Sequence, residues 1–577
     1  MITLVVPGRL VGMYLRATQR KNRDGTVVRY VQLAHNRRVD GVTQAQVLLN
    51  LGREDQLDRD GLARLVTSIN RYLGTADPAA ADAAQLVGDG LCVTGSRPVG
   101  AVHLLDGLWR ALEIDAALRK VLGPRRFSTD VERVLFALVA NRAIDPMSKL
   151  SDAEWATCDV AIDGLEVMDE DQAYRAMDLL VEADAQAQVQ EAVFFAVANL
   201  LNLEVDLLFF DTTSTYFERD TEDSGDEAFR RYGHSKDHRD DLPQIVIGLA
   251  VTKEGIPVRS WCWPGNTSDQ AILPEVKDDM RGWRLGRVIT VVDRGFSSAD
   301  NLAYLRRAGG HFIAGMRMRD GNPLVEQVLA RQGRYQQVKE NLRVKEVRIA
   351  DTDVRFVICH NPEQAERDRT QGEDALARLE AELERIRQAR ERDRKKTNAT
   401  TREKAEAEHS KAECPLRDHR TLGRWLRQSA TGRLSINRAK IKAEERLDGK
   451  YLIATSDPHL SAEDTALGYK NLLEAERGFR DLKSSLLLRP VFHRLEHRIR
   501  AHVLLCWLAL LLVRVAERRT GLTWRRINTE LARVHAVTLT GSAGTAVHTT
   551  PLTTAQAGIL RDCQFPAPTT VTALDPA

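Results

Sequence analysis

The chain has 577 residues, of which 43% are hydrophobic and 28% charged. This length exceeds one ordinary hydrophobic core, so we expect two to four structural units, and the composition excludes a disordered or fibrous chain. Lys and Arg total 83 against 81 Asp and Glu, and the net charge of +2 neither indicates nor excludes a nucleic-acid partner. The 7 cysteines form no C-x-x-C pair, which argues against a zinc ribbon or a disulfide framework and favours a reducing cytoplasm.

Residues 1–74 are expected to form a small β-rich module. Strand-like segments at Met13–Thr18 and Val27–Leu33 flank a polar turn, and a helix with one apolar face follows. The Ala- and Asp-rich stretch 75–85 has the composition of a linker.

Residues 86–204 have a helical pattern. Within it, Thr129 and Glu132 have the spacing of a capping box, which predicts the start of a helix with a regular apolar stripe.

From Leu207 the apolar residues come in short runs that are typical of strands buried on both faces. Together with one helix, these runs predict a mixed α/β sheet. The expected strands are Leu207–Phe210, Gln244–Val251, Pro257–Trp263, Arg287–Val292 and His311–Gly315.

Residues 321–460 interrupt this pattern with further strands and one strongly charged helix, roughly 363–392. Its apolar residues recur at 3-4-3 spacing, which favours a protruding helical hairpin or short coiled coil and, equally, a solvated amphipathic helix. The α/β pattern resumes over 461–540, and the Thr-, Ala- and Pro-rich tail 541–577 is expected to add little structure.

No membrane partner is expected. Met1–Pro7 is apolar but lacks the basic region and cleavage site of a secretory signal. The longest apolar run, Val503–Val513, is about half of a membrane span, and it predicts a helix buried in the protein core.

Three acidic residues stand in positions that suggest chemistry. Asp211 and Asp293 each follow an apolar strand, at the end that opens onto the ligand-binding crevice in α/β sheets. Glu476 lies among apolar residues of its helix, so we expect it on the inward stripe, where an ionised carboxylate must be paired or bind a metal. Three converging carboxylates would suit Mg²⁺ or Mn²⁺, and two such ions can promote phosphodiester cleavage.

The surroundings of Glu476 suit a polyanionic substrate. Residues 477–500 hold seven Lys or Arg against two acids, and the polar, basic segment Gly233–Arg239 follows Asp211. Because this charge adjoins the candidate acid, contact with DNA phosphates is the favoured interpretation.

These residues resemble the DDE transposases of bacterial insertion sequences, in the group with a Tyr-x2-Arg-x3-Glu-x6-Lys signature. Tyr469, Glu476 and Lys483 match that signature, and Leu472 replaces its Arg. The other similar blocks are Phe210–Ser214, Asp293 with its neighbours 292–296, Gly233–Arg239, Pro264–Thr267 and Phe479–Ser484.

The resemblance implies an RNase H-like catalytic domain in two parts, 205–320 and 461–540, separated by a mainly β insertion at 321–460. Asp211, Asp293 and Glu476 would be the catalytic, metal-binding triad, with two Mg²⁺ or Mn²⁺ ions. Tyr469 and Lys483 would hold DNA phosphates. We expect further DNA contacts from the cationic residues nearby, namely Arg480, Arg294, His234, Lys236 and Arg239.

The implied protein is a cytoplasmic bacterial transposase that cuts and pastes DNA. Its partners would be double-stranded transposon ends, recognised by residues 1–200, and target DNA, with a homodimer forming in the DNA complex. Two alternatives stay open: a catalytically inactive DNA-binding descendant, and an RNase H-like nuclease without strand transfer.

Overall fold

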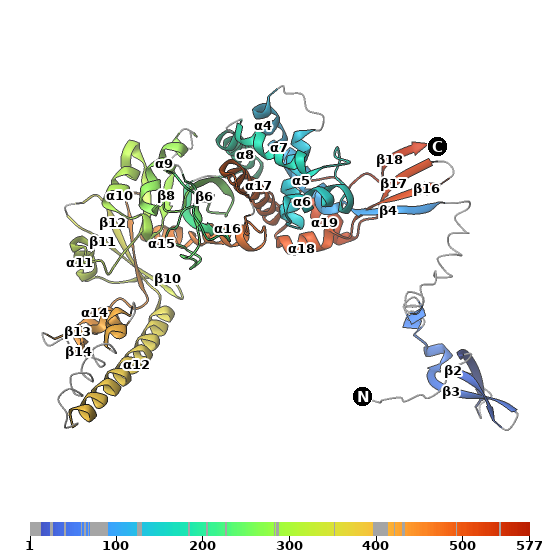
Figure 1. Cartoon of the computed structure of the whole chain (residues 1–577), viewed down its shortest axis with the longest axis horizontal. Helices are drawn as coiled ribbons and strands as arrows, with labels where there is room; N and C mark the ends of the chain where they lie inside the picture. Colours follow the sequence, from blue (N-terminus) through green and yellow to red (C-terminus); the bar gives the residue numbers. More distant parts are fainter. Residues whose placement is uncertain are drawn as a thin grey trace. The chain divides into compact units, whose positions relative to one another are not determined.

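The computed structural model describes 15 segments of the chain and a few isolated residues (61, 62, 65, 66, 69 and 283); the segments are 13–22, 27–39, 42–58, 91–123, 130–182, 185–203, 206–225, 228–281, 288–350, 352–395, 413–419, 422–429, 433–491, 493–541 and 544–576. Contacts divide the chain into two units (Figure 1). The first comprises 1–94, 538–546 and 573–577, and the second comprises 95–537 and 547–572.

The N-terminal module is a three-stranded antiparallel sheet in the order β1-β2-β3. Its strands are β1 (Met13–Lys21), β2 (Val27–Val39) and β3 (Val42–Arg53), so the prediction of a β-rich start is confirmed. Most of the expected helix after residue 60 and the expected linker at 75–85 lie outside the described residues.

The tail after residue 541 is more ordered than its composition predicts. A four-stranded sheet has the order β18-β17-β16-β4, with β4 at Cys92–Pro98, β16 at His535–Gly541, β17 at Gly544–Thr549 and β18 at Val571–Pro576. Helix α19 (Thr554–Asp562) begins with a capping box made by Thr553 and Gln556. Thr and Val favour strands, and the Thr-x-x-Gln spacing favours a helix start, so these residues form elements that overall composition does not predict.

A nine-stranded sheet dominates the second unit, in the order β10-β11-β12-β15-β9-β8-β5-β6-β7. Strands β5, β6 and β7 are antiparallel neighbours, whereas β8 and β9 run parallel to β5. The bounds are β5 Leu207–Tyr216, β6 Gln244–Thr252, β7 Pro257–Pro264, β8 Ile289–Val292, β9 His311–Met316, β10 Gln336–Lys339, β11 Leu342–Arg348, β12 Arg355–His360 and β15 Lys450–Thr455. The mixed α/β sheet is confirmed, and strands of the expected insertion extend this same sheet.

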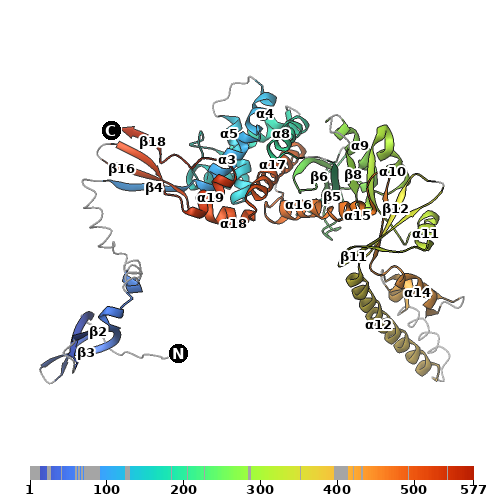
Figure 2. The same cartoon turned by 180° about the vertical axis from the view of Figure 1, so that it is seen from behind.

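Helices cover both faces of the sheet (Figures 1 and 2). On one face, Leu208 and Phe210 of β5 belong to the same cluster as residues of α9 (Asp269–Arg281), α10 (Ala299–Arg306) and α11 (Pro323–Ala330). On the other face, Phe209 joins α15 (Ala462–Lys470) and α16 (Leu473–Ser484). Successive residues of β5 therefore point into two different cores, as its uninterrupted apolar run predicts.

The region 100–201 is helical, as predicted, but it has no core of its own. It consists of α3 (Gly100–Ala111), α4 (Ile114–Leu122), α5 (Val131–Ile144), α6 (Lys149–Glu154), α7 (Glu170–Glu182) and α8 (Ala185–Leu201). Helix α17 (Glu496–Thr520) contacts α3, α5, α7 and strand β7, and α18 (Trp524–Leu531) follows it. One hydrophobic cluster includes residues of these helices and of the sheet face that α16 covers. The expected end of the helical region at residue 204 therefore does not separate two hydrophobic cores.

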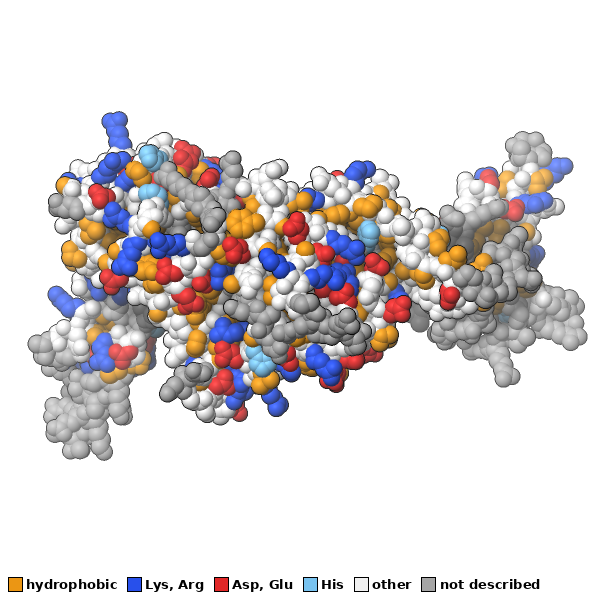
Figure 3. Space-filling model, turned by 90° about the horizontal axis from the view of Figure 1, so that it is seen from above, with side chains coloured by type: hydrophobic (Ala, Val, Ile, Leu, Met, Phe, Trp, Pro, Cys, Tyr) orange, Lys and Arg blue, Asp and Glu red, His pale blue; other side chains and the backbone are white. Residues whose placement is uncertain are grey.

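The buried position of α17 confirms the interpretation of the apolar run 503–513. By length and composition α17 could cross a membrane, but 94% of its apolar window is buried inside the protein. The face drawn in Figure 3 carries positive and negative side chains interspersed, in keeping with the small net charge.

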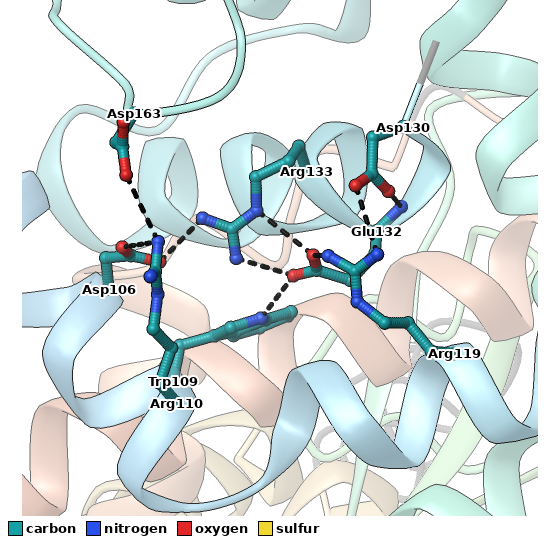
Figure 4. Close-up of polar contacts among 8 residues, drawn as sticks. All are labelled: Asp106, Trp109, Arg110, Arg119, Asp130, Glu132, Arg133 and Asp163. Atoms are coloured by element: carbon teal, nitrogen blue, oxygen red, sulfur yellow. Dashed lines mark hydrogen bonds and ion pairs between the residues drawn. The ribbon is translucent and has the colours of Figure 1, made fainter. Parts of the chain in front are cut away.

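Helix α5 starts differently from the prediction. Asp130 is its N-cap, accepting from the backbone N–H of Glu132 at 3.1 Å, and Thr129 lies outside the described residues. The Glu132 carboxylate is 1% exposed and instead accepts hydrogen bonds from Trp109 (2.7 Å), Arg119 (2.5 Å) and Arg133 (2.6 Å) (Figure 4). Because α5 is buried almost all round, this carboxylate lies in the core, where its charge must be paired.

The charged helix α12 (Pro362–Arg394) packs on a small core of its own. Leu379 of its apolar stripe is fully buried with Trp425 and Ile441, near β13 (Leu426–Gln428), β14 (Leu434–Ile436) and α14 (Arg438–Glu445). The stripe is therefore covered and not solvated. Residues 396–412, which follow this helix, lie outside the described residues.

Two buried histidines, His493 and His502, have rings 5.3 Å apart near α17. Burial, followed by the nearby charges of Lys149 and Arg142, lowers the pKa of His493 from 6.5 to about 4. Burial likewise lowers the pKa of His502 well below 6.5. Both rings are therefore neutral in the folded protein at neutral pH.

Acidification is expected to destabilise this core. Between pH 6.5 and about 4 the unfolded chain binds protons that the folded His493 does not, so the free energy of unfolding decreases as the pH falls through that range. His493 contributes up to about 3 kcal/mol of this loss. His493→Gln, which does not titrate, should flatten the dependence in denaturant titrations across this range, and an equally steep profile in the variant would contradict the assignment.

Candidate functional site

Asp211 and Asp293 lie side by side on adjacent parallel strands. Phe210 of β5 pairs with Val292 of β8, so the two acids are the next residues of strands spaced about 4.8 Å apart. Asp211 lies within β5, which continues along β6 to Tyr216, whereas β8 ends just before Asp293. The expected convergence of these two acids is therefore present.

Asp211 lies close to charged groups of both signs. Its carboxylate accepts from the backbone N–H of Thr212 at 2.7 Å and lies 3.9 Å from the Lys236 ammonium. Burial raises the pKa of Asp211 to about 6; Lys236 and the Thr212 N–H oppose this rise, while the negative charges of Asp293 and Asp269 add to it. Asp211 therefore titrates close to neutral pH.

Asp269, at the start of α9, is a third carboxylate in this cluster. Thr212 Oγ1 donates to Asp269 Oδ1 at 2.5 Å, and Lys236 Nζ lies 3.2 Å from Asp269 Oδ2. Sequence reasoning missed this residue. The available signal was its place two residues after the block Pro264–Thr267.

Tyr469 contacts Asp293 directly. Its hydroxyl donates to Asp293 Oδ1 at 2.7 Å. Burial, followed by the charge of Asp293, raises the pKa of Tyr469, so the hydroxyl keeps its proton and acts as a donor. The ring lies against Gly315 of β9, where any Cβ would overlap the Tyr469 hydroxyl, so this contact depends on glycine at position 315.

Glu476 faces outward, which corrects the expectation of an inward position. The buried residues of α16 are Ala475, Gly478, Phe479 and Leu482. Together with buried Leu472 these follow 3-4-3 spacing, which leaves Leu473 and Glu476 on the exposed side. Glu476 instead lines a cavity of about 620 Å³ together with Asp293 and Tyr469.

The same cavity is rich in cations. Arg294, Arg317, Arg319 and Lys450 line it, with Asp320 as a further acid. Arg294 is exposed, as expected for a DNA contact, while Arg317 and Arg319 were not singled out from the sequence. The cavity therefore offers two carboxylates of the expected triad and a positively charged wall.

The remaining candidate DNA-binding residues differ in their partners. Lys483 Nζ donates to both oxygens of Asp237 at 2.9 Å. Arg239 pairs with Asp241 at 2.8 Å, and Arg480 and His234 are exposed. Leu472, in place of the signature Arg, is 6% exposed and belongs to the core. Arg489, which also pairs with Asp237 at 2.8 Å, belongs to the basic run 477–500 but was not singled out from it.

The donor set fits a hard divalent cation in chemistry. Asp211, Asp269 and Asp293 carry carboxylate oxygens, the ligands that Mg²⁺ and Mn²⁺ prefer, and a cation would relieve the repulsion of Asp211 by the negative charges of Asp293 and Asp269. In the described part of the chain, no group of three or more His, Cys, Asp or Glu side chains is close enough together to hold a metal ion. Lys236 and Tyr469 contact these carboxylates instead.

Comparisons with known proteins relate this site to transposition. A sequence model described as the IS1634 family transposase N-terminal domain matches residues 15–82, and one described as the transposase DDE domain matches residues 206–512. A comparison with curated proteins finds no match.

Among solved structures, a cryo-EM structure of the piggyBac transposase synaptic complex with hairpin DNA is 10% identical, with a TM-score of 0.35, and covers 74% of this chain and 79% of that one. The DDE match alone spans more than half of the chain and includes Asp211, Asp293 and Glu476. The protein belongs to the DDE transposase family.

Proposed function

We propose that this transposase binds the ends of an insertion sequence and catalyses metal-dependent DNA cleavage and strand transfer. The observation that carries the proposal is that Asp211 and Asp293 directly follow the paired residues Phe210 and Val292 of two parallel strands, with Glu476 on the cavity that Asp293 lines. We assign these three acids as the catalytic triad. The order β7-β6-β5-β8-β9, with three antiparallel and then two parallel strands, supports an RNase H-like core.

The protein's own groups would divide the work around Mg²⁺ or Mn²⁺. Asp211, Asp293 and Glu476 would hold the ions, which when bound supply charge stabilisation at the attacking and leaving oxygens of the phosphodiester. Tyr469 orients Asp293 through its hydrogen bond. The Lys236 ammonium balances Asp211 and Asp269, and it can turn from them to a DNA phosphate.

Recognition of DNA would involve both units. We propose that the N-terminal module, which has the matched IS1634-type domain, reads the transposon ends together with the helices before residue 200. The cations Arg294, Arg480 and Lys483 would hold phosphates next to the acids. His234, Lys236 and Arg239, in the loop between β5 and β6, would make further phosphate contacts. A homodimer would bring two ends together.

Purified protein is expected to nick DNA at the terminal inverted repeats of its insertion sequence. It should join these ends to a target plasmid only with Mg²⁺ or Mn²⁺. The measurement is product analysis on gels of labelled end DNA, with EDTA and Ca²⁺ as controls. Cleavage without joining would instead identify an RNase H-like nuclease. End binding without cleavage in either metal would identify an inactive descendant, and products formed in EDTA would overturn the mechanism.

A further inference from the structure

The Asp237 carboxylate lies between two cations from another part of the chain. Lys483 Nζ, on α16, donates to Asp237 Oδ1 and Oδ2 at 2.9 Å, and Arg489 Nη1 lies 2.8 Å from Oδ2. The three side chains are 12%, 15% and 31% exposed for Lys483, Asp237 and Arg489. The cluster is thus partly buried and open to solvent on the Arg489 side.

Hydrogen bonds hold the backbone of the two residues before Asp237. The backbone N–H of Lys236 donates to Ser214 Oγ of β5 at 2.9 Å, and that of Ser235 donates to Asp240 Oδ1 at 2.6 Å. Lys236, one residue earlier, points its ammonium at Asp211 and Asp269. Two neighbouring residues of one loop therefore carry opposite charges to different partners. Lys236 places its positive charge beside Asp211 and Asp269, and Asp237 places its negative charge beside Lys483 and Arg489.

The charges of this cluster do not balance. Among the described residues, Asp237 is the only carboxylate paired with Lys483 or Arg489, so two positive charges share one negative charge. Lys236 lies close enough to Lys483 to contribute to lowering its pKa, after burial as the main cause. The Arg489 guanidinium also lies over the Tyr216 ring at 5.4 Å, which fixes its plane. The surplus positive charge is oriented and accessible, as an anion site requires.

We propose that Lys483 and Arg489 form a binding site for one DNA phosphate, and that Asp237 occupies this site as an internal substitute that the phosphate displaces. A carboxylate and a phosphate both present two oxygens to a Lys and an Arg, so one can replace the other on the same donors. Arg489 then supplies the positive charge of the signature Arg, which Leu472 replaces in this chain. This inference rests on the proposed function only in taking DNA as the ligand.

The test compares Asp237→Asn with Asp220→Asn in binding a duplex that carries one transposon end, without divalent metal. Asp220 is an exposed carboxylate beyond the end of β5, so its replacement changes the net charge equally. Loss of the internal competitor should tighten binding by Asp237→Asn about tenfold, against less than about twofold for the control. The slope of log Kd against log salt should steepen by about one, since the cations then exchange a salt ion for the phosphate.

A second variant keeps the result interpretable if Asp237→Asn alters folding. Arg489→Met should weaken binding severalfold, and in the Asp237→Asn protein it should remove most of the tenfold gain. Equal affinity of Asp237→Asn and Asp220→Asn, or a gain that persists without Arg489, would overturn the inference. These outcomes concern binding without metal, so they are distinct from a failure of cleavage, which bears on the proposed function.

Discussion

Replacing Glu476 with Gln is expected to lower DNA cleavage by about a thousandfold or more while changing end-DNA affinity less than about threefold. The substitution removes one negative charge that would hold metal beside the scissile phosphate and keeps the size of the side chain. The cations that we propose to bind phosphates stay in place. Cleavage of labelled ends and gel shifts, measured on the same preparations, check both parts of this expectation.

Glu474→Gln is the matched control, because Glu474 is on the same helix, carries the same charge and pairs with Arg477 at 3.9 Å. It should cleave at nearly the normal rate. Lys483→Ala should give the opposite pattern to Glu476→Gln, with weaker end binding and a salt dependence flatter by about one ion. Cleavage that survives Glu476→Gln, or is lost equally in Glu474→Gln, would remove Glu476 from the triad.

Glu132→Ala is expected to give the largest loss of stability, about 3–5 kcal/mol, because it leaves the buried Arg133 without one of its counter-charges. Arg133 is 6% exposed, and among the described residues the acid it still pairs with is Asp106 at 2.6 Å. Trp109 loses its acceptor at the same time, and Arg119 retains its pair with Asp130 at 3.1 Å. The midpoint of thermal unfolding should fall markedly, and amide hydrogen exchange in α5 should accelerate.

Asp163→Asn provides the comparison within the same network. Asp163 is 87% exposed and pairs with Arg110 at 3.3 Å, and such surface pairs contribute less than about 1 kcal/mol. Similar midpoints for Glu132→Ala and Asp163→Asn would contradict the view that burial of the Glu132 charge makes this network important.

The parts of the site that follow from local patterns were predictable. The apolar runs before Asp211 and Asp293 predict strands, and parallel strands bring their ends to one edge, so this pairing could be expected. The signature spacing identified Tyr469 and Lys483, although the partners of both in this structure, Asp293 and Asp237, are acids.

Other features depend on tertiary contacts that no local pattern encodes. The helix has apolar residues within one turn before and after Glu476. Only the packing of α16 decides that Leu472, rather than Leu473, faces the core. Asp269 lies at the start of α9, and Arg489 lies in the segment after α16. Only the folding of the whole domain brings these two residues to the site. Glu132 has the spacing of a cap residue, but α5 is buried on nearly every side, so the charge is drawn into the core.

The late position of α16 and α17 in the chain bears on protein synthesis. Glu476 follows Asp293 by 183 residues, which a ribosome adds in roughly 10–40 s. During that time the α16 face of the sheet lacks the helix that covers it, because α16 and α17 belong to the same cluster as Phe209 of β5. Under the proposed mechanism, an unfinished or prematurely terminated chain has two of its three acids and no closed core, so it cannot cut the DNA that encodes it.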